Sequence, residues 1–154
     1  MRRSKQEITD STEIQNIISR ARTARLGINR EGAPYVLPMN FGFADNTFYF
    51  HCADSGLKLD LLQADPRVCI EIDESSELQT GEVSNPCKWG VNYRSVIAIG
   101  TAEILTDIDL KRTALKIIIS QFAGNNAPEM PEASIKATTV FRVKSENLTA
   151  KHSS

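Results

Sequence analysis

The chain has 154 residues, of which 41% are hydrophobic, and a formal net charge of −1 at pH 7. This length predicts a single domain over residues 1–154, with one core, a basic N-terminal tip (Arg2, Arg3, Lys5) and a C-terminal tail, both solvated and frayed. A charge near zero argues against nucleic-acid binding by phosphate neutralisation. Neither a signal peptide nor a stretch long enough to span a bilayer is visible, so we expect a soluble, cytoplasmic protein without membrane contact.

The first predicted element is a helix over residues 11–21. Asp10 can cap its start, and Glu13 is placed to complete a capping box. Turn signals and alternating apolar residues then predict two strands, at residues 23–29 and 34–43. Pro38 restricts the second of these strands to a sheet edge or a bulge, because proline has no N–H to donate.

The middle of the chain predicts three shorter elements, namely a strand at 47–52, a helix at 57–63 and a strand at 67–72. An acidic stretch follows, comprising Glu71, Asp73, Glu74, Glu77 and Glu82. We expect it to become a long loop that ends near Lys88, and loops of this length in compact domains are functional covers or mobile segments.

The last third of the chain predicts a long strand over residues 92–105, with a bend at Gly100. Asp107 can cap an amphipathic helix whose apolar stripe contains Leu110, Leu115, Ile118, Ile119 and Phe122. A final strand is expected over residues 138–144.

These elements predict a mainly β fold with peripheral helices, in which about six strands joined by hairpin turns form an antiparallel sheet closed as a small barrel. Strands and helices do not alternate regularly, which argues against a doubly wound parallel sheet. Four phenylalanines alternate on neighbouring strands and are explained as barrel core, namely Phe41, Phe43, Phe48 and Phe50.

The three cysteines, Cys52, Cys69 and Cys87, form an odd set without Cys-x-x-Cys spacing, which is typical of free thiols in a reducing compartment. Cys69 alternates with apolar residues, so we expect it in the core. No metal site is expected, because His51 and His152 are far apart and lack partners at ligand spacing.

The most informative segment is residues 50–58, where a strand ends at a histidine and a short turn leads into a helix with Lys58 in its first turn. Unpaired N–H groups and the positive dipole end make such a helix start an anion site. Arg94 and Ser95 add a guanidinium and a hydroxyl from a later strand. Two structural alternatives stay open: Lys58 could lie on a solvated face beside Asp54 or Asp60, and Arg94 could pair across strands with Glu71 or Glu103.

Four segments in this order carry a family resemblance, namely residues 35–42, 50–58, 66–68 and 89–96. The chain resembles the pyridoxamine 5′-phosphate oxidase-like flavoproteins, and among them the branch of nitroimidazole-resistance (Nim-type) proteins. The resemblance spans nearly the whole chain. It implies an FMN-binding split β-barrel that forms a homodimer, with two flavins in clefts between the subunits.

The resemblance also implies roles for residues of this sequence. The phosphate would be surrounded by His51, Ala53, Gly56 and Lys58, with Arg94 and Ser95 completing its cage. The isoalloxazine ring would lie beside Pro38, Met39 and Asn40, mostly along their backbone, and Trp89 would wall the cleft. His51 would also occupy a catalytic position next to the flavin. Cys52, in the same turn, stands where many relatives have serine, and Ser55 where they often have glutamate.

The function implied is that of an FMN-dependent oxidoreductase that reduces a small acceptor such as a nitroaromatic, with NAD(P)H as a possible donor docking in the open cleft. A flavin-binding store or sensor without turnover is the alternative from another class. A deazaflavin-dependent reductase, a haem protein with His51 as axial ligand and a structural dimer without ligand also stay open. In the flavin interpretation, Lys58→Ala and Arg94→Ala should each weaken FMN binding by about 1.5–3 kcal/mol.

Overall fold

The protein is described by a computed structural model that covers residues 4–83, 85–124 and 128–153. Its strands are β1 (Glu7–Ile8), β2 (Ala24–Ile28), β3 (Tyr35–Met39), β4 (Phe41–Ala44), β5 (Thr47–Cys52), β6 (Arg67–Gln79), β7 (Gly90–Leu105) and β8 (Thr139–Ser153). Its helices are α1 (Ser11–Arg20), α2 (Leu57–Ala64), α3 (Ile108–Ala123) and α4 (Glu132–Ala137), with short 3₁₀ turns at Ser4–Gln6 and Pro86–Lys88. The predicted tip residues Arg2 and Arg3 lie outside the described residues.

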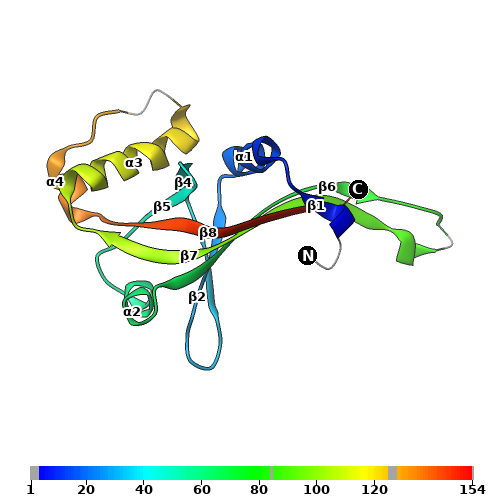
Figure 1. The fold of residues 1–154 in the computed structure, drawn as a ribbon, viewed down its shortest axis with the longest axis horizontal. Helices are drawn as coiled ribbons and strands as arrows, with labels where there is room; N and C mark the ends of the chain where they lie inside the picture. Colours follow the sequence, from blue (N-terminus) through cyan, green and yellow to red (C-terminus); the bar gives the residue numbers. More distant parts are fainter. Residues whose placement is uncertain (1–3, 84, 125–127, 154) are drawn as a thin grey trace.

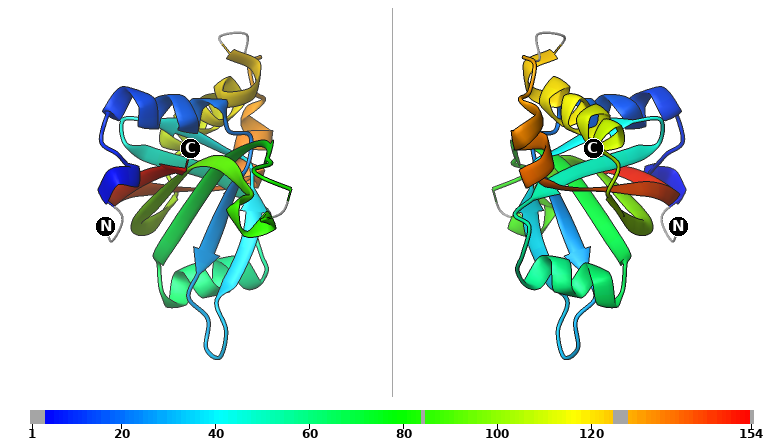
Figure 2. Two further views of the ribbon diagram at one scale, coloured as in Figure 1. Left: turned by 90° about the vertical axis from the view of Figure 1, so that its right-hand side faces the viewer. Right: turned by 90° about the vertical axis from the view of Figure 1, so that its left-hand side faces the viewer.

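All strands belong to one antiparallel sheet in the order β3-β2-β6-β7-β8-β5-β4, and β1 pairs with β8 beside this path (Figure 1). The sheet curls so strongly that its two edge strands, β3 and β4, are consecutive in the chain and separated only by Asn40. The end-on views in Figure 2 show this curl. The predicted mainly β, antiparallel split barrel with helices on its outside is therefore confirmed.

The strand predicted over residues 34–43 is in fact two strands on opposite edges of the sheet. Pro38 lies on the edge strand β3, as predicted, because its missing N–H costs nothing where no further strand pairs. This division, together with the short strand β1, raises the strand count from six to eight. Neither β1 nor α4 is long enough to have given a periodic signal in the sequence.

The core fills the inside of the curled sheet and is closed by α1 (Figure 1). Phe41, Phe48 and Phe50 are fully buried, and Phe43 packs against them, as predicted. Burial of a phenylalanine side chain contributes about 1.5–3 kcal/mol, so these rings are a main source of stability. The helix α1 adds Ile17 from its apolar stripe, and Asp10 caps it by accepting a hydrogen bond from Thr12 N at 2.8 Å, as predicted.

The helix α3 packs closely on β4 at Gly42. A Cβ atom at this glycine would lie 2.6 Å from the backbone nitrogen of Ile118, so any larger residue would push the helix away. Asp107 caps α3 through its carboxylate, which accepts hydrogen bonds from the N–H groups of Asp109 and Leu110. The predicted helix and its cap are both confirmed.

The long loop predicted after the acidic stretch is mostly strand, since β6 continues to Gln79. The acidic side chains are compatible with a strand because arginines of neighbouring elements neutralise them: Arg25 pairs with Glu71 at 2.8 Å and Arg20 with Glu74 at 2.8 Å. Of the described residues between β6 and β7, Pro86–Lys88 form the 3₁₀ turn and the others belong to no helix or strand.

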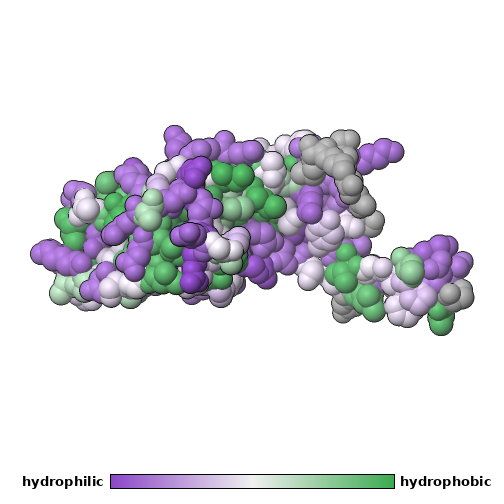
Figure 3. All heavy atoms as spheres, turned by 90° about the horizontal axis from the view of Figure 1, so that it is seen from below, coloured by the Kyte–Doolittle hydropathy of each residue, from purple (hydrophilic) through white to green (hydrophobic). Residues whose placement is uncertain are grey.

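Beyond the last β7–β8 pair, Tyr93 with Ser153, the β6–β7 ribbon continues with only two strands. We call this projection, as far as the structure describes it (residues 76–83 and 85–92), the arm. It extends away from the barrel in Figure 1 and stands apart from it in the view of Figure 3.

The last strand is much longer than predicted, because β8 runs from Thr139 to Ser153 rather than ending at Lys144. It pairs with nearly the whole of β7. The pairing shifts at Gly100, which is opposite Ser145 while Ile99 is opposite Asn147, so Glu146 is an extra residue on β8. A pairing irregularity thus falls at Gly100, where a bend was predicted, but its extra residue is on β8, which continues past Lys144 instead of ending there.

We expect Gln121→Ala to lower the free energy of unfolding by about 1–2 kcal/mol. The side-chain amide of Gln121, on α3, donates to the carbonyl oxygens of Ile18, Ser19 and Ala21 at 2.9–3.1 Å and thereby satisfies the C-terminal end of α1. Urea denaturation would measure the change, with the exposed Gln63→Ala as control. Equal stabilities of the two variants would contradict this role.

Candidate functional site

Three segments of the predicted site meet at one place, namely the end of β3, the end of β5 and the first turn of α2. The ammonium nitrogen of Lys58 lies 3.7 Å from the sulfur of Met39, which is buried. His51 and Cys52, at the end of β5, are close enough for the charge of Lys58 to shift the pKa of each. The structure therefore brings together Met39, His51, Cys52 and Lys58, which we call the Lys58 cluster.

Lys58 has no carboxylate partner among the described residues, although it is half-buried. Neither Asp54 nor Asp60, the two acids considered from the sequence, forms an ion pair with it. Most other described arginines and lysines lie within 4.0 Å of a carboxylate oxygen. A cation left without a counter-charge in this setting suits an anionic ligand.

The backbone before α2 is held open by Gly56. Its φ of 117° is a conformation that residues with a side chain rarely adopt. A Cβ atom there would meet nothing within 4 Å, so the space above the helix start is free. Gly56 is also the N-cap of α2 and provides no side-chain hydrogen bond, which leaves the first N–H groups of the helix available.

The two titratable neighbours of Lys58 are both neutral near pH 7. Partial desolvation, and then the positive charge of Lys58, lower the pKa of His51 below its usual 6.5. Burial raises the pKa of the Cys52 thiol, and the opposing effect of Lys58 does not cancel this rise. Cys52 is therefore a neutral thiol, and its environment does not favour the reactive thiolate.

We expect His51→Gln to flatten the pH dependence of stability on the acid side. A histidine whose pKa is lower in the folded protein binds fewer protons than in the unfolded chain. Its contribution is therefore complete above about pH 6.5 and is lost as the pH falls through the folded pKa. Urea denaturation between about pH 5 and pH 8 measures this slope, and His152→Gln removes the other histidine as a control. A parent-like slope in the His51 variant would contradict the prediction.

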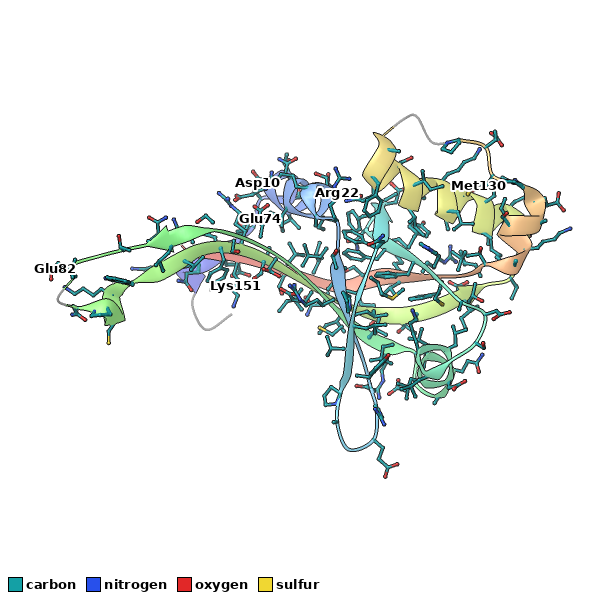
Figure 4. The ribbon with its side chains drawn as sticks, turned by 180° about the vertical axis from the view of Figure 1, so that it is seen from behind. Asp10, Arg22, Glu74, Glu82, Met130 and Lys151 are labelled. Atoms are coloured by element: carbon teal, nitrogen blue, oxygen red, sulfur yellow. The ribbon has the colours of Figure 1, made fainter. Side chains whose placement is uncertain are left out.

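The other predicted phosphate ligands do not join the Lys58 cluster within one chain. Arg94 points to the face of the sheet covered by α1, where its guanidinium lies 3.2 Å from Glu13 and 3.6 Å from Glu74. Figure 4 shows Glu74 close to α1. The ion-pair alternative for Arg94 is thus realised, but with other partners than Glu71 and Glu103. Glu13, from which a capping box was expected, is engaged here instead.

Ser95 follows Arg94 on the same strand, so its side chain points to the opposite face. It is 7% exposed, and its hydroxyl has no hydrogen-bond partner in the part of the chain that the structure describes. Buried hydroxyls without partners are rare in folded proteins, so a donor remains available here.

Trp89 is also distant from the Lys58 cluster, because it lies in the arm, directly before the first residue of β7. Its indole N–H donates to the carbonyl oxygen of Glu82 at 3.2 Å, and its ring is half-buried against the turn of the arm. Figure 4 shows Glu82 at the far end of the arm. The ring therefore packs on the arm of its own chain, and its place on a cleft wall remains a prediction.

A further surface, which sequence reasoning missed, lies on the side of β2, β3, β6 and β7 that faces away from the core; we call it the outer face. Register places Pro38, Arg25, Glu71 and Ile97 side by side across these four strands. Beside them is a groove of about 610 Å³, lined among others by Val36, Cys69 and Ile99. The signal that could have revealed this surface is the unbroken apolar run of residues 96–99, which is typical of a strand covered on both faces.

Cys69 was expected in the core and is instead exposed on this outer face. Val68 and Ile70, its neighbours in the sequence, are the residues that point inward. Where a strand carries apolar residues on both of its faces, the sequence alone does not show which of the two faces points into the core.

No group of three or more His, Cys, Asp or Glu side chains gathers as a metal site within the described residues. In the same part of the chain, no helix has both the length and the apolar composition needed to cross a membrane.

Several solved structures are similar to this protein over nearly its whole length. A candidate 5-nitroimidazole antibiotic resistance protein from Bacteroides thetaiotaomicron is 30% identical, with a TM-score of 0.84 over 95% of this chain and 86% of that one. The flavocytochrome Anf3 from Azotobacter vinelandii (20% identity, TM-score 0.84, 100% and 72% covered) and an FAD and heme binding protein from Mycobacterium smegmatis (18%, 0.85, 96% and 73%) share the fold.

No curated protein matches the sequence at a significant level. Residues 10–152, however, match the family described as pyridoxamine 5′-phosphate oxidase. Together with the split barrel and the 30% identical structure, this match shows that the chain belongs to the pyridoxamine 5′-phosphate oxidase family.

Proposed function

We propose that this protein binds FMN and acts as a flavin-dependent oxidoreductase of Nim type, which reduces a small acceptor such as a nitroaromatic. The observation that carries the proposal is the uncompensated Lys58 at the open start of α2, in a family member whose 30% identical relative is named for nitroimidazole resistance. A phosphate monoester carries about −1.5 to −2 charges at neutral pH, which Lys58 and the helix start would balance in part.

The residues present fit a phosphate at the Lys58 cluster. Lys58 would bind a phosphate oxygen, and the N–H groups that follow Gly56 would donate to others. Arg94 lies apart from the Lys58 cluster of its own chain and could join these groups only from a second subunit and only by leaving Glu13 and Glu74, so we assign it a smaller share than the sequence suggested. Ser95, which also lies apart from the Lys58 cluster of its own chain, would offer from a second subunit a hydroxyl without a hydrogen-bond partner among the described residues.

Bound flavin supplies hydride or single-electron transfer, and the protein supplies placement and polarity. Pro38 and Asn40 are exposed on either side of the buried Met39, so their backbone can border a flat ring. His51 is neutral at pH 7 and can therefore hold one proton and accept another, which keeps it a candidate for proton transfer. A direct catalytic role for His51 is part of the proposal.

The proposal includes a homodimer with the flavin in clefts between subunits. Two features support it: Trp89 lies far from the Lys58 cluster of its own chain, and Pro38 and Ser95 both face outward. The arm reaches past its own barrel (Figure 1), and in the proposed dimer it would wall a cleft of the second subunit.

The visible absorbance spectrum of freshly purified protein, with identification of any released chromophore, tests the proposal. We expect a yellow protein that releases FMN, is reduced by NADH or NADPH, and is reoxidised by a nitroimidazole. A colourless protein that also fails to take up FMN would overturn the flavin assignment. Release of FAD would show that the cofactor is FAD and not FMN, and a haem spectrum would favour the haem alternative.

The same protein preparation distinguishes an oxidoreductase from the alternative without turnover, a flavin store or sensor. A store would bind FMN and stay oxidised in the presence of NADH, NADPH and the nitro acceptor, whereas an oxidoreductase would turn over. Dithionite-reduced protein mixed with the acceptor provides the control, because it bypasses the choice of electron donor.

A further inference from the structure

Arg94 and Ser95 are neighbours on β7, so their side chains point to opposite sides of the sheet. Arg94 is on the side of α1, where its guanidinium pairs with Glu13 and Glu74. Ser95 is on the other side, to which the outer face belongs. A phosphate that accepts a hydrogen bond from the Ser95 hydroxyl therefore needs a cation other than Arg94.

The cation on the side of Ser95 is Lys151. The register of β7 and β8 places the two residues directly opposite each other, so their side chains share one side of the sheet. Val96 and Ala150, the next pair in the same register, are 1% and 2% exposed and face the core. Figure 4 shows Glu74 on the side of α1 and Lys151 on the side away from it.

The ammonium group of Lys151 is held in place but not neutralised. Its nitrogen lies 5.4 Å from the centroid of the Tyr93 ring, which is on the same side of the sheet. Within the described residues, Lys151 is half-buried and forms no ion pair. Glu7, its neighbour on β1, is exposed and not paired with it, and Asp73, on β6, is paired with Arg25. A cation without a counter-charge in such a setting suits an anionic ligand.

The hydroxyl of Ser95 also points to a ligand. It has no hydrogen-bond partner in the described part of the chain although Ser95 is only 7% exposed, and such buried hydroxyls are rare in folded proteins. A groove of about 330 Å³ begins two residues away, at the base of the arm. It is lined, among others, by Ser75, Tyr93 and Ser153 on the side of Ser95 and by Glu74, Arg94 and His152 on the side of α1. There is thus space beside Ser95 and Lys151 for a ligand larger than a bare ion.

We infer that Ser95, Lys151 and Tyr93 form a phosphate subsite, in which Lys151 has the role that the sequence suggested for Arg94. The ammonium of Lys151 and the hydroxyl of Ser95 donate to phosphate oxygens, and the ring of Tyr93 positions the ammonium. The ligand class is a phosphate monoester, which carries about −1.5 to −2 charges at neutral pH.

Two ligands of the proposed function carry such a group. One is FMN, whose phosphate this subsite would share with the Lys58 cluster of a second subunit. The other is NADPH, which differs from NADH by one phosphate monoester. The choice between these ligands rests on the proposed function, whereas the subsite itself rests on the contacts of Ser95 and Lys151.

Titration of the protein with inorganic phosphate, followed by NMR, tests the subsite without reference to flavin. We expect saturable shifts of the amide signals of Ser95 and Lys151 in the parent and their loss in Lys151→Ala. Lys144→Ala, which removes an exposed lysine from the same strand, is the matched control and should behave like the parent. A parent without these shifts, or a folded Lys151→Ala variant that retains them, would overturn the inference.

Binding of FMN and of riboflavin, which lacks the phosphate, to the apoprotein tests the first source. If the flavin phosphate occupies the subsite, Lys151→Ala should lower the ratio of FMN affinity to riboflavin affinity about tenfold or more, the effect of losing a hydrogen bond to a charged group. Ser95→Ala should lower the same ratio by a smaller factor, and Lys151→Arg should restore it, because a guanidinium also binds phosphate.

Steady-state kinetics with NADPH and NADH test the second source. If the donor phosphate occupies the subsite, Lys151→Ala should raise the ratio of the KM for NADPH to the KM for NADH about tenfold and leave the flavin ratio unchanged. Two parent-like ratios would contradict both sources. A parent that takes up no FMN but shows the phosphate-dependent shifts would contradict the proposed function and support the subsite.

Discussion

Lys58→Ala is expected to weaken FMN binding about 10–150-fold, which corresponds to about 1.5–3 kcal/mol for a hydrogen bond to a charged group. Lys58 is the half-buried cation of the cluster, and its charge is not balanced by a carboxylate in the described part of the chain. Its removal leaves the N–H groups at the helix start as the main groups of the Lys58 cluster that would hold the phosphate. Fluorescence titration of the apoprotein with FMN measures the change.

Arg94→Ala is the informative control for this experiment. Its guanidinium is already neutralised by Glu13 and Glu74, so we expect its loss to change the FMN dissociation constant several-fold less than the loss of Lys58. If the Lys58 variant binds FMN like the parent, the phosphate of FMN does not bind at the Lys58 cluster. An Arg94 variant with the larger effect would mean that Arg94 leaves its ion pairs to hold the phosphate.

Gly100→Ala is expected to destabilise the fold by about 3 kcal/mol or more, because inserted atoms that cannot be accommodated typically cost 1–3 kcal/mol even where side chains can adjust. A Cβ atom at this position would lie 2.8 Å from Cγ1 of Val143 and still closer to the carbonyl oxygen of Lys144. That oxygen belongs to the backbone of β8 next to the bulge, so it cannot move without breaking the pairing of the two longest strands.

Gly90→Ala on the same strand is the matched control for Gly100→Ala, since a Cβ atom there meets nothing within 4 Å. Thermal and urea denaturation of both variants measure the difference. If Gly100→Ala is as stable as Gly90→Ala, the close approach of β8 to Gly100 is not a constraint on the fold.

The Lys58 cluster was largely predictable because its parts are close in sequence. A strand that ends at His51, a glycine turn and a lysine in the first helical turn form a local unit, and the structure keeps it as one. Met39 comes from a different edge of the sheet, and only the curl of the barrel brings it to Lys58. Arg94 could not be placed from sequence, because its partner Glu13 is 81 residues away in the chain.

Several elements could be predicted correctly because local chemistry alone defines them. The cap at Asp10 and the apolar stripe of α1, the cap at Asp107, and the strand over residues 47–52 are all found as predicted. Capping hydrogen bonds and helical or alternating periodicity involve residues a few positions apart, so they can be recognised before the chain is folded.

Tertiary structure decided everything that depends on which strand lies next to which. It divided residues 34–43 between two edges, turned the acidic stretch into strand by supplying arginines, and extended β8 to Ser153 along β7. It also decided that Cys69 faces outward and that one face of β7 stays uncovered by the described residues. Pairing partners and the inward side of a two-faced strand are set by contacts across the whole sheet, and a single sequence does not encode them locally.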